Sequence, residues 1–304
     1  MLQGTNDTRY AFVTGLIRAR EARLLKKSHF DRLIEAEIGN FKAILSDTPY
    51  AAGEEFLETL STAEKLERFF FEKYCLHEEI KEIILLPHAI HNLKVRLKKG
   101  PERLLSPVNL FWLESSEEIL AIINDYLTHK NSFLLSAKLD RFYCERIWKS
   151  ACISEFFTEY FKLFFDLENI RSFFRARQFE NPLELFKEVY IPYGTIPERV
   201  FVEHLSKDFT VVVRVFRNTP YDRIIEQGGG YLETDGSFLR LERLIDEMRL
   251  QFLKTARYYT FGIEPLFGYY NFKLNEIRLL RQVYMGKLYN IPTAQLRESL
   301  PDVW

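Results

Sequence analysis

Cysteine is scarce in this chain, which contains three cysteines among 304 residues. Cys75, Cys144 and Cys152 form no C-x-x-C pair, and an odd number cannot pair completely within one chain. The sequence also begins without a signal-like segment. This pattern predicts a reduced, cytosolic protein whose thiols are packing residues.

Long apolar runs and an excess of one charge are also absent. No stretch approaches the roughly 18 uninterrupted apolar residues of a bilayer-spanning helix, so any association with a membrane is expected to be peripheral. The 42 basic and 43 acidic residues give a net charge of −1. Nucleic-acid-binding proteins usually carry a basic excess, so we expect no nucleic-acid partner.

The sequence lacks the familiar motifs of catalysis, since it contains no HExxH, no GxSxG and no glycine-rich phosphate loop of standard spacing. His88 and His91 could share one helix face, but no third ligand lies at a telling distance, so ordinary polar histidines are favoured over a metal site. The three glycines at 228–230 predict a flexible connection. We therefore expect no active site, no cofactor and no small-molecule substrate.

Helical periodicity dominates the chain. Over residues 153–165 the apolar side chains recur at helical spacing, and Glu155, Glu159, Lys162 and Asp166 are assigned to the opposite, charged face. A first helix is expected after Asp7, within residues 7–25. Further helices are predicted at 61–76, 78–99, 115–129, 136–151, 182–190, 237–256 and 264–287.

One β-branched segment could be read as a strand. Residues 209–216 have the sequence FTVVVRVF. No partner strand with clean alternation is found elsewhere, and an unpaired strand is not stable alone. A helix is therefore predicted over residues 199–216, and the fold class is all-α.

A short step recurs three times along the chain. It reads LERF at 66–69, LDRF at 139–142 and LERL at 241–244, and each copy is followed by NLK at 92–94, NIR at 169–171 or EIR at 276–278. A T-P-Y turn also recurs, at 48–50 and 219–221. Repetition of this kind predicts copies of one supersecondary unit. The glycine and proline breaks place these pseudo-repeats at about 8–106, 107–191 and 192–304 of a single domain.

The repeated basic residues Lys94, Arg171 and Arg278 have two interpretations. Each could brace its own repeat through an ion pair, with the repeated acids Glu67, Asp140 and Glu242 as candidate partners. Alternatively, pseudo-symmetry could bring the three bases around one axis, where they would line a cavity for an acidic or polar partner.

The ordered motifs resemble one family. Residues 10–25, the steps at 92–94, 139–141 and 169–171, and the N-T-P-Y turn at 218–221 are similar to the central-stalk C subunit of V-type and A-type ATPases, the relative of the eukaryotic d subunit. The tail carries the strongest similarity, with NEIRLLR at 275–281, GKL at 286–288, IP at 291–292 and LRE at 296–298. The resemblance extends over about residues 8–300.

This resemblance implies three pseudo-threefold-related helical units that form a funnel-shaped socket. It further implies a non-catalytic rotor component, peripheral to the membrane on its cytoplasmic side. Such a component joins the rotor shaft, made of the D and F subunits, to the proteolipid ring and transmits torque between ATP hydrolysis or synthesis and ion transport. Two alternatives stay open from the residues alone: a helical-repeat scaffold that binds a partner helix or peptide in a groove, and a helical enzyme with an unrecognised pocket.

Overall fold

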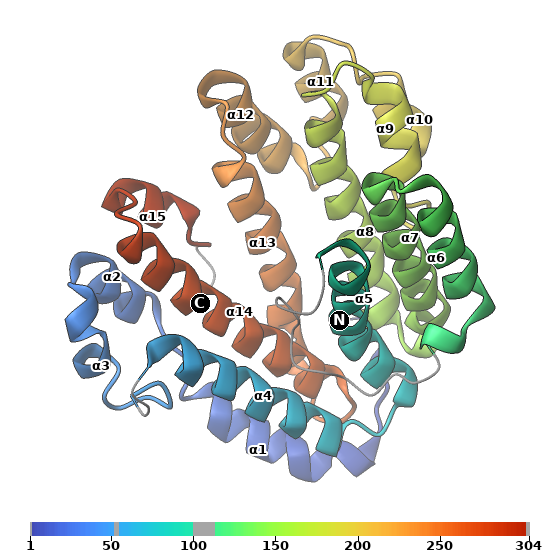
Figure 1. The fold of residues 1–304 in the computed structure, drawn as a ribbon. Coiled ribbons are helices and arrows are strands. Elements are labelled where there is room, and N and C mark those ends of the chain that lie inside the picture. Colours follow the sequence, from blue (N-terminus) through green and yellow to red (C-terminus); the bar gives the residue numbers. More distant parts are fainter. Residues whose placement is uncertain (1, 52–54, 100–112, 302–304) are drawn as a thin grey trace. The chain divides into compact units, whose positions relative to one another are not determined.

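The structure is a computed structural model that describes residues 2–51, 55–99 and 113–301 (Figure 1). Every regular element within these residues is a helix, which confirms the predicted all-α class. The chain forms two compact units. Unit 1 comprises Met1–Gln3 and Cys75–Lys207, and unit 2 comprises Gly4–Tyr74 and Asp208–Trp304. The middle of the sequence therefore folds as one unit, and the two ends of the sequence fold together as the other.

Unit 1 is built around α7, which packs against α5, α6 and α9. Its helices are α5 (Glu78–Lys99), α6 (Glu117–His129), α7 (Ser132–Ser150), α8 (Glu155–Ala176), α9 (Pro182–Val189) and α10 (Glu198–Val202). Apolar side chains of α5, α6 and α7, among them Leu86, Ile119 and Leu139, form one core cluster. Asn131 begins α7 by accepting backbone hydrogen bonds from residues 133 and 134, as N-cap residues do.

The apolar face of α8 forms as predicted, but one residue that was predicted for its charged face is buried. Asp166 is fully buried. Its carboxylate accepts hydrogen bonds from the backbone N–H groups of Thr195 and Ile196, at 2.9 and 3.0 Å, and from the Thr195 hydroxyl at 2.5 Å. The loop before α10 thus covers this side of α8, and its hydrogen bonds replace those that water would make to the carboxylate.

Unit 2 is built around the long helix α14, which packs against α1, α2, α4 and α13. Its helices are α1 (Ala11–Glu21), α2 (Lys27–Glu35), α3 (Phe41–Ile44), α4 (Phe56–Tyr74), α11 (Phe209–Phe216), α12 (Gly230–Asp235), α13 (Leu239–Lys254), α14 (Glu264–Leu288) and α15 (Thr293–Ser299). Figure 1 shows the blue N-terminal helices α1 and α4 beside the red α14. The core therefore joins residues from both ends of the sequence, among them Phe30, Leu60 and Leu280.

The predicted helices are found, with differences of a few residues at their ends. For example, α4 begins at Phe56, where 61 was predicted, and α7 begins at Ser132, where 136 was predicted. The predicted helix over 199–216 is two helices, because residues 203–208 separate α10 from α11. The β-branched segment 209–216 is helical as predicted. Its buried Val212 and Phe216 are four residues apart, so a packed helical face outweighs strand propensity.

The glycines at 228–230 are not a flexible connection, so that prediction was wrong. Gly228 and Gly229 are buried in a π-helical segment, η6 (Ile224–Gly229), which continues directly into α12. A Cβ atom at Gly228 would lie 2.9 Å from the Cα atom of Leu241, closer than real side chains approach. Here glycine serves to bring η6 against the backbone of α13.

Replacing Gly228 by alanine should destabilise unit 2 by about 1–3 kcal/mol, because the added methyl group must displace the α13 backbone. Gly15 is the matched control. It lies within α1 with open space around it, so Gly15→Ala should stabilise the protein by about 0.5–1 kcal/mol. Urea unfolding of the purified variants measures both effects. Equal stabilisation by the two substitutions would contradict the close packing of η6 against α13.

None of the described helices is both long and apolar enough to cross a membrane. This result concerns residues 2–51, 55–99 and 113–301.

Candidate functional site

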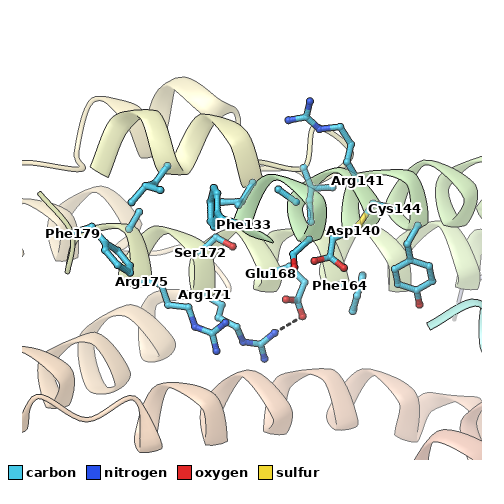
Figure 2. Close-up of a pocket in the computed structure, with 17 residues that line it drawn as sticks. Phe133, Asp140, Arg141, Cys144, Phe164, Glu168, Arg171, Ser172, Arg175 and Phe179 are labelled. Atoms are coloured by element: carbon cyan, nitrogen blue, oxygen red, sulfur yellow. Dashed lines mark hydrogen bonds and ion pairs between the residues drawn. The ribbon is translucent and has the colours of Figure 1, made fainter. Parts of the chain in front are cut away.

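Unit 1 contains a cavity of about 780 Å³ between α7, α8 and α9 (Figure 2). Most of its wall is apolar, and charged side chains from α7 and α8 supply the polar part. Its lining includes Phe133, Ala137, Asp140, Arg141, Cys144, Phe164, Glu168, Arg171, Arg175, Phe179, Leu185 and Ile191. An apolar wall with a few charged groups suits the binding of a mainly apolar surface.

Arg171 lines this cavity from α8. Its guanidinium forms an ion pair with Glu168, one helical turn earlier, and Figure 2 shows Arg171 and Arg175 extending toward the same side of α8. Arg141, on α7, donates to the backbone carbonyls of residues 187 and 188 at the end of α9. The guanidinium of Arg141 thereby fixes the α9 wall against α7.

Lys94 lies on α5 and reaches the same part of unit 1 through an ion pair. Its Nζ atom is 2.6 Å from Asp140 Oδ1, and Asp140 is a lining residue of the cavity. In unit 1, therefore, the repeated base Arg171 lies in the cavity wall, and the repeated base Lys94 forms an ion pair with an acid of that wall. Asp140 is also one of the three repeated acids.

Arg278 belongs to α14 of unit 2. Its Nη2 atom is 2.6 Å from Asp246 Oδ2 on α13 and 2.8 Å from Asn275 Oδ1 on α14. Asp246 lies one turn after the repeated acid Glu242. The first repeated acid, Glu67, contacts Arg20 at 2.8 Å. Each repeated base thus has an acidic partner inside its own unit.

In the second and third copies, the polar residue two positions before the repeated base holds a backbone segment, a role that the sequence interpretation missed. The Asn169 side chain donates to the carbonyl of Ile191 at 2.8 Å and accepts from the Ile191 N–H at 2.9 Å. At the matching place in the third copy, Glu276 accepts from the N–H of Leu25 at 2.5 Å. The signal that could have revealed this role was a polar residue inside an apolar stretch of helix.

Glu276 is also the centre of a buried polar network in unit 2. Its carboxylate accepts a hydrogen bond from the Tyr50 hydroxyl at 2.6 Å and lies 2.5 Å from Lys273 Nζ. Burial and the nearby Glu276 charge raise the pKa of Tyr50 above its ordinary value, so the hydroxyl stays protonated and donates. Glu276 and Lys273 are both at most 5% exposed.

The two T-P-Y turns have the same hydrogen bonds. In each, the threonine hydroxyl donates to the carbonyl three residues back, and the tyrosine N–H donates to that hydroxyl oxygen. The distances are 2.7 and 3.2 Å around Thr48, and 2.6 and 3.3 Å around Thr219. The side chains of the two turns therefore act alike, as ST-turn residues do.

Cys144, in the cavity wall, is poorly suited to act as a nucleophile. Burial raises the pKa of this thiol well above its ordinary value, so it stays protonated. His88 and His91 both lie on α5. Within the residues that the structure describes, no group of three or more histidine, cysteine, aspartate or glutamate side chains could hold a metal ion.

Comparison with known proteins gives a consistent family. The family model for the ATP synthase (C/AC39) subunit matches residues 112–299. The chain is 24% identical to the C subunit of the V-type sodium ATPase of Enterococcus hirae, over 97% of this chain and 99% of that protein. It is 24% identical to the C subunit of the A-type ATP synthase of Thermococcus onnurineus, over 91% of this chain and 86% of the relative. For the C subunit of the A-type ATP synthase of Methanocaldococcus jannaschii the identity is 19%, over 96% and 86%.

The family model covers more than half of the chain, and the similarity to these C subunits extends over nearly its full length. The resemblance seen in the ordered motifs is thereby confirmed. The chain belongs to the ATP synthase (C/AC39) subunit family.

Proposed function

We propose that this chain is the non-catalytic central-stalk component that couples the shaft, made of the D and F subunits, to the membrane proteolipid ring. In this role it transmits torque between ATP hydrolysis or synthesis and ion transport, as a peripheral component on the cytoplasmic side of the membrane. The observation that carries the proposal is the match to a V-type ATPase C subunit along almost the whole of both chains. The shaft and ring partners come from the family resemblance.

A socket requires a closed arrangement of repeats, and the joining of the chain ends supports one. Within unit 2, the N–H of Thr5 donates to Glu264 at 2.7 Å, and the N–H of Leu25 donates to Glu276 at 2.5 Å. An open superhelix leaves its first and last repeats apart, each with a capped end. Hydrogen bonds from the N-terminal segment to the last long helix therefore favour a closed structure over the alternative of an open groove-binding scaffold.

Equivalent contacts at equivalent positions support the proposed pseudo-repeats near 8–106, 107–191 and 192–304. Asn169 and Glu276 both hold the backbone that follows a neighbouring helix of their unit, at Ile191 and Leu25. The two T-P-Y turns also share their hydrogen bonds. Shared geometry of this kind within one chain is what repeated supersecondary units produce. We propose on this basis that three such units surround a funnel-shaped socket.

Binding to both partners tests the proposal. Purified chain is added to vesicles that contain only the proteolipid ring, and separately to a purified D–F shaft. We expect it to sediment with the ring vesicles, to co-elute with the shaft, and to bridge the two when all are present. Protein-free vesicles are the control. A monomer that binds neither partner would refute the proposed role.

A further inference from the structure

The repeated LERF-type step is buried in two copies and exposed in one. Leu139, Phe142, Leu241 and Leu244 are at most 5% exposed. In the first copy, Leu66 and Phe69 are 63% and 65% exposed. The same apolar positions that complete a core elsewhere in this chain therefore face solvent on α4.

The cause is that the buried face of α4 is shifted by one residue relative to the buried faces of α7 and α13, which carry the other two copies. Beside the repeated step, the side chains that α4 buries against α14 are Phe70 and Phe71. The ring centroids of Phe71 and Tyr270 are 4.7 Å apart, and those of Phe70 and Tyr269 are 6.1 Å apart. One residue corresponds to about 100° around a helix. Leu66 and Phe69, three residues apart, consequently share a different and uncovered side of α4.

Lysines flank these two side chains, whereas the neighbouring acids are paired with arginines. Lys65 and Lys73 are both exposed on α4. The acids of the same stretch are held by arginines of unit 2: Glu64 lies 3.1 Å from Arg281, Glu67 lies 2.8 Å from Arg20, and Glu72 lies 3.7 Å from Arg68. The exposed apolar pair is therefore flanked by lysine charge.

We propose that this surface, the α4 face (Lys65, Leu66, Phe69 and Lys73), binds an acidic amphipathic helix of a partner protein. Two apolar side chains three residues apart match the spacing of a helix that presents one apolar stripe. Carboxylates beside that stripe would complement the two lysines. The inference goes beyond the proposed coupling role, because it names a surface and a partner chemistry that the role does not require.

A protein helix fits the α4 face better than a lipid bilayer does. Helices that lie on membranes carry a continuous apolar stripe over several turns with a basic polar face. Here the exposed apolar pair occupies one turn, and the start of α4 carries exposed acids, Glu55 just before the helix and Glu58 in its first turn. An extended anionic membrane surface would meet these acids as well as the lysines, whereas a helix can contact the lysine-flanked turn alone.

Photocrosslinking in the assembled ATPase complex tests this proposal. Benzoylphenylalanine replaces Phe69, and the cross-linked peptide is identified by mass spectrometry. We expect it to map to a helical segment of another subunit that carries aspartate or glutamate beside an apolar stripe. Tyr258, also in unit 2 and 70% exposed, is the control position and should not capture that segment.

Charge reversal supplies the second arm of the test. The double variant Lys65→Glu and Lys73→Glu should lower the cross-link yield at least tenfold, and Lys65→Arg with Lys73→Arg should preserve it. The proposal is overturned by cross-links to lipid, by cross-links to residues of this same chain, by the absence of any cross-link, or by a yield that charge reversal leaves unchanged. None of these outcomes would contradict the proposed coupling role, which is tested separately by binding to the ring and to the shaft.

Discussion

Replacing Glu276 by alanine should lower the free energy of unfolding of unit 2 by about 3–5 kcal/mol. The substitution removes the acceptor of the Leu25 N–H and of the Tyr50 hydroxyl, and it leaves the ammonium of Lys273 buried without its partner. An unpaired buried charge is among the costliest defects that a single substitution can create. Hydrogen exchange of the α14 amides, followed by mass spectrometry, measures the loss.

Two further variants separate the buried charge from other effects of the substitution. The double variant Glu276→Leu with Lys273→Met removes both charges and should recover much of the loss, since apolar pairs often replace buried ion pairs at little cost. Glu35→Ala is the surface control within unit 2, because Glu35 is largely exposed in its pair with Arg297, and it should change stability by less than about 0.5 kcal/mol. A loss of under about 1 kcal/mol in Glu276→Ala would contradict the network.

The triple variant Lys94→Gln, Arg171→Gln and Arg278→Gln should lower the number of ions transported per ATP hydrolysed by at least tenfold. Water reaches at least one partner in each of the three ion pairs, and exposed pairs contribute only about 0–1 kcal/mol each. Bracing alone is thus a weak reason for the recurrence of these bases, which favours the alternative that they line the proposed socket. Transport and hydrolysis are measured together on vesicles that contain the complex.

A matched triple variant shows whether the lost charge or its position matters. Arg146, Lys162 and Arg240 are also ion-paired bases, two in unit 1 and one in unit 2, but they do not belong to the repeated step. Their replacement by glutamine should cost similar stability and preserve coupling. If the repeated bases only brace the fold, the first triple variant will instead unfold more readily and keep its transport ratio.

The helices of this chain could be predicted because their apolar residues repeat with helical spacing over many turns. The glycines at 228–230 could not be placed correctly, since the reason for glycine there is the backbone of Leu241, distant in sequence. Asp166 was misplaced for a related reason: its partners at Thr195 and Ile196 lie about thirty residues away. Local patterns specify helices, whereas long-range hydrogen bonds decide which polar residues are buried.

The candidate site was predictable in part. The repeated bases could be picked out from the sequence, and Asp140, the partner of Lys94, was among the candidate acids, but the partners of the other two bases were not. Arg171 pairs with Glu168 and Arg278 with Asp246, and neither acid belongs to the repeated step. The exposure of Leu66 and Phe69 was hidden as well, because a repeat in sequence predicts equal burial, and α4 turns a different face toward α14. Helix rotation depends on the neighbouring helix, which a repeat pattern does not contain.

The coupling ratio is the most direct test of the central claim. The ATPase complex is assembled in vesicles without this chain, and ATP hydrolysis and ion uptake are recorded together before and after purified chain is added back. The account predicts hydrolysis without ion uptake in the depleted vesicles, and uptake proportional to hydrolysis after the addition. Ion uptake that is equally strong without the chain would contradict it.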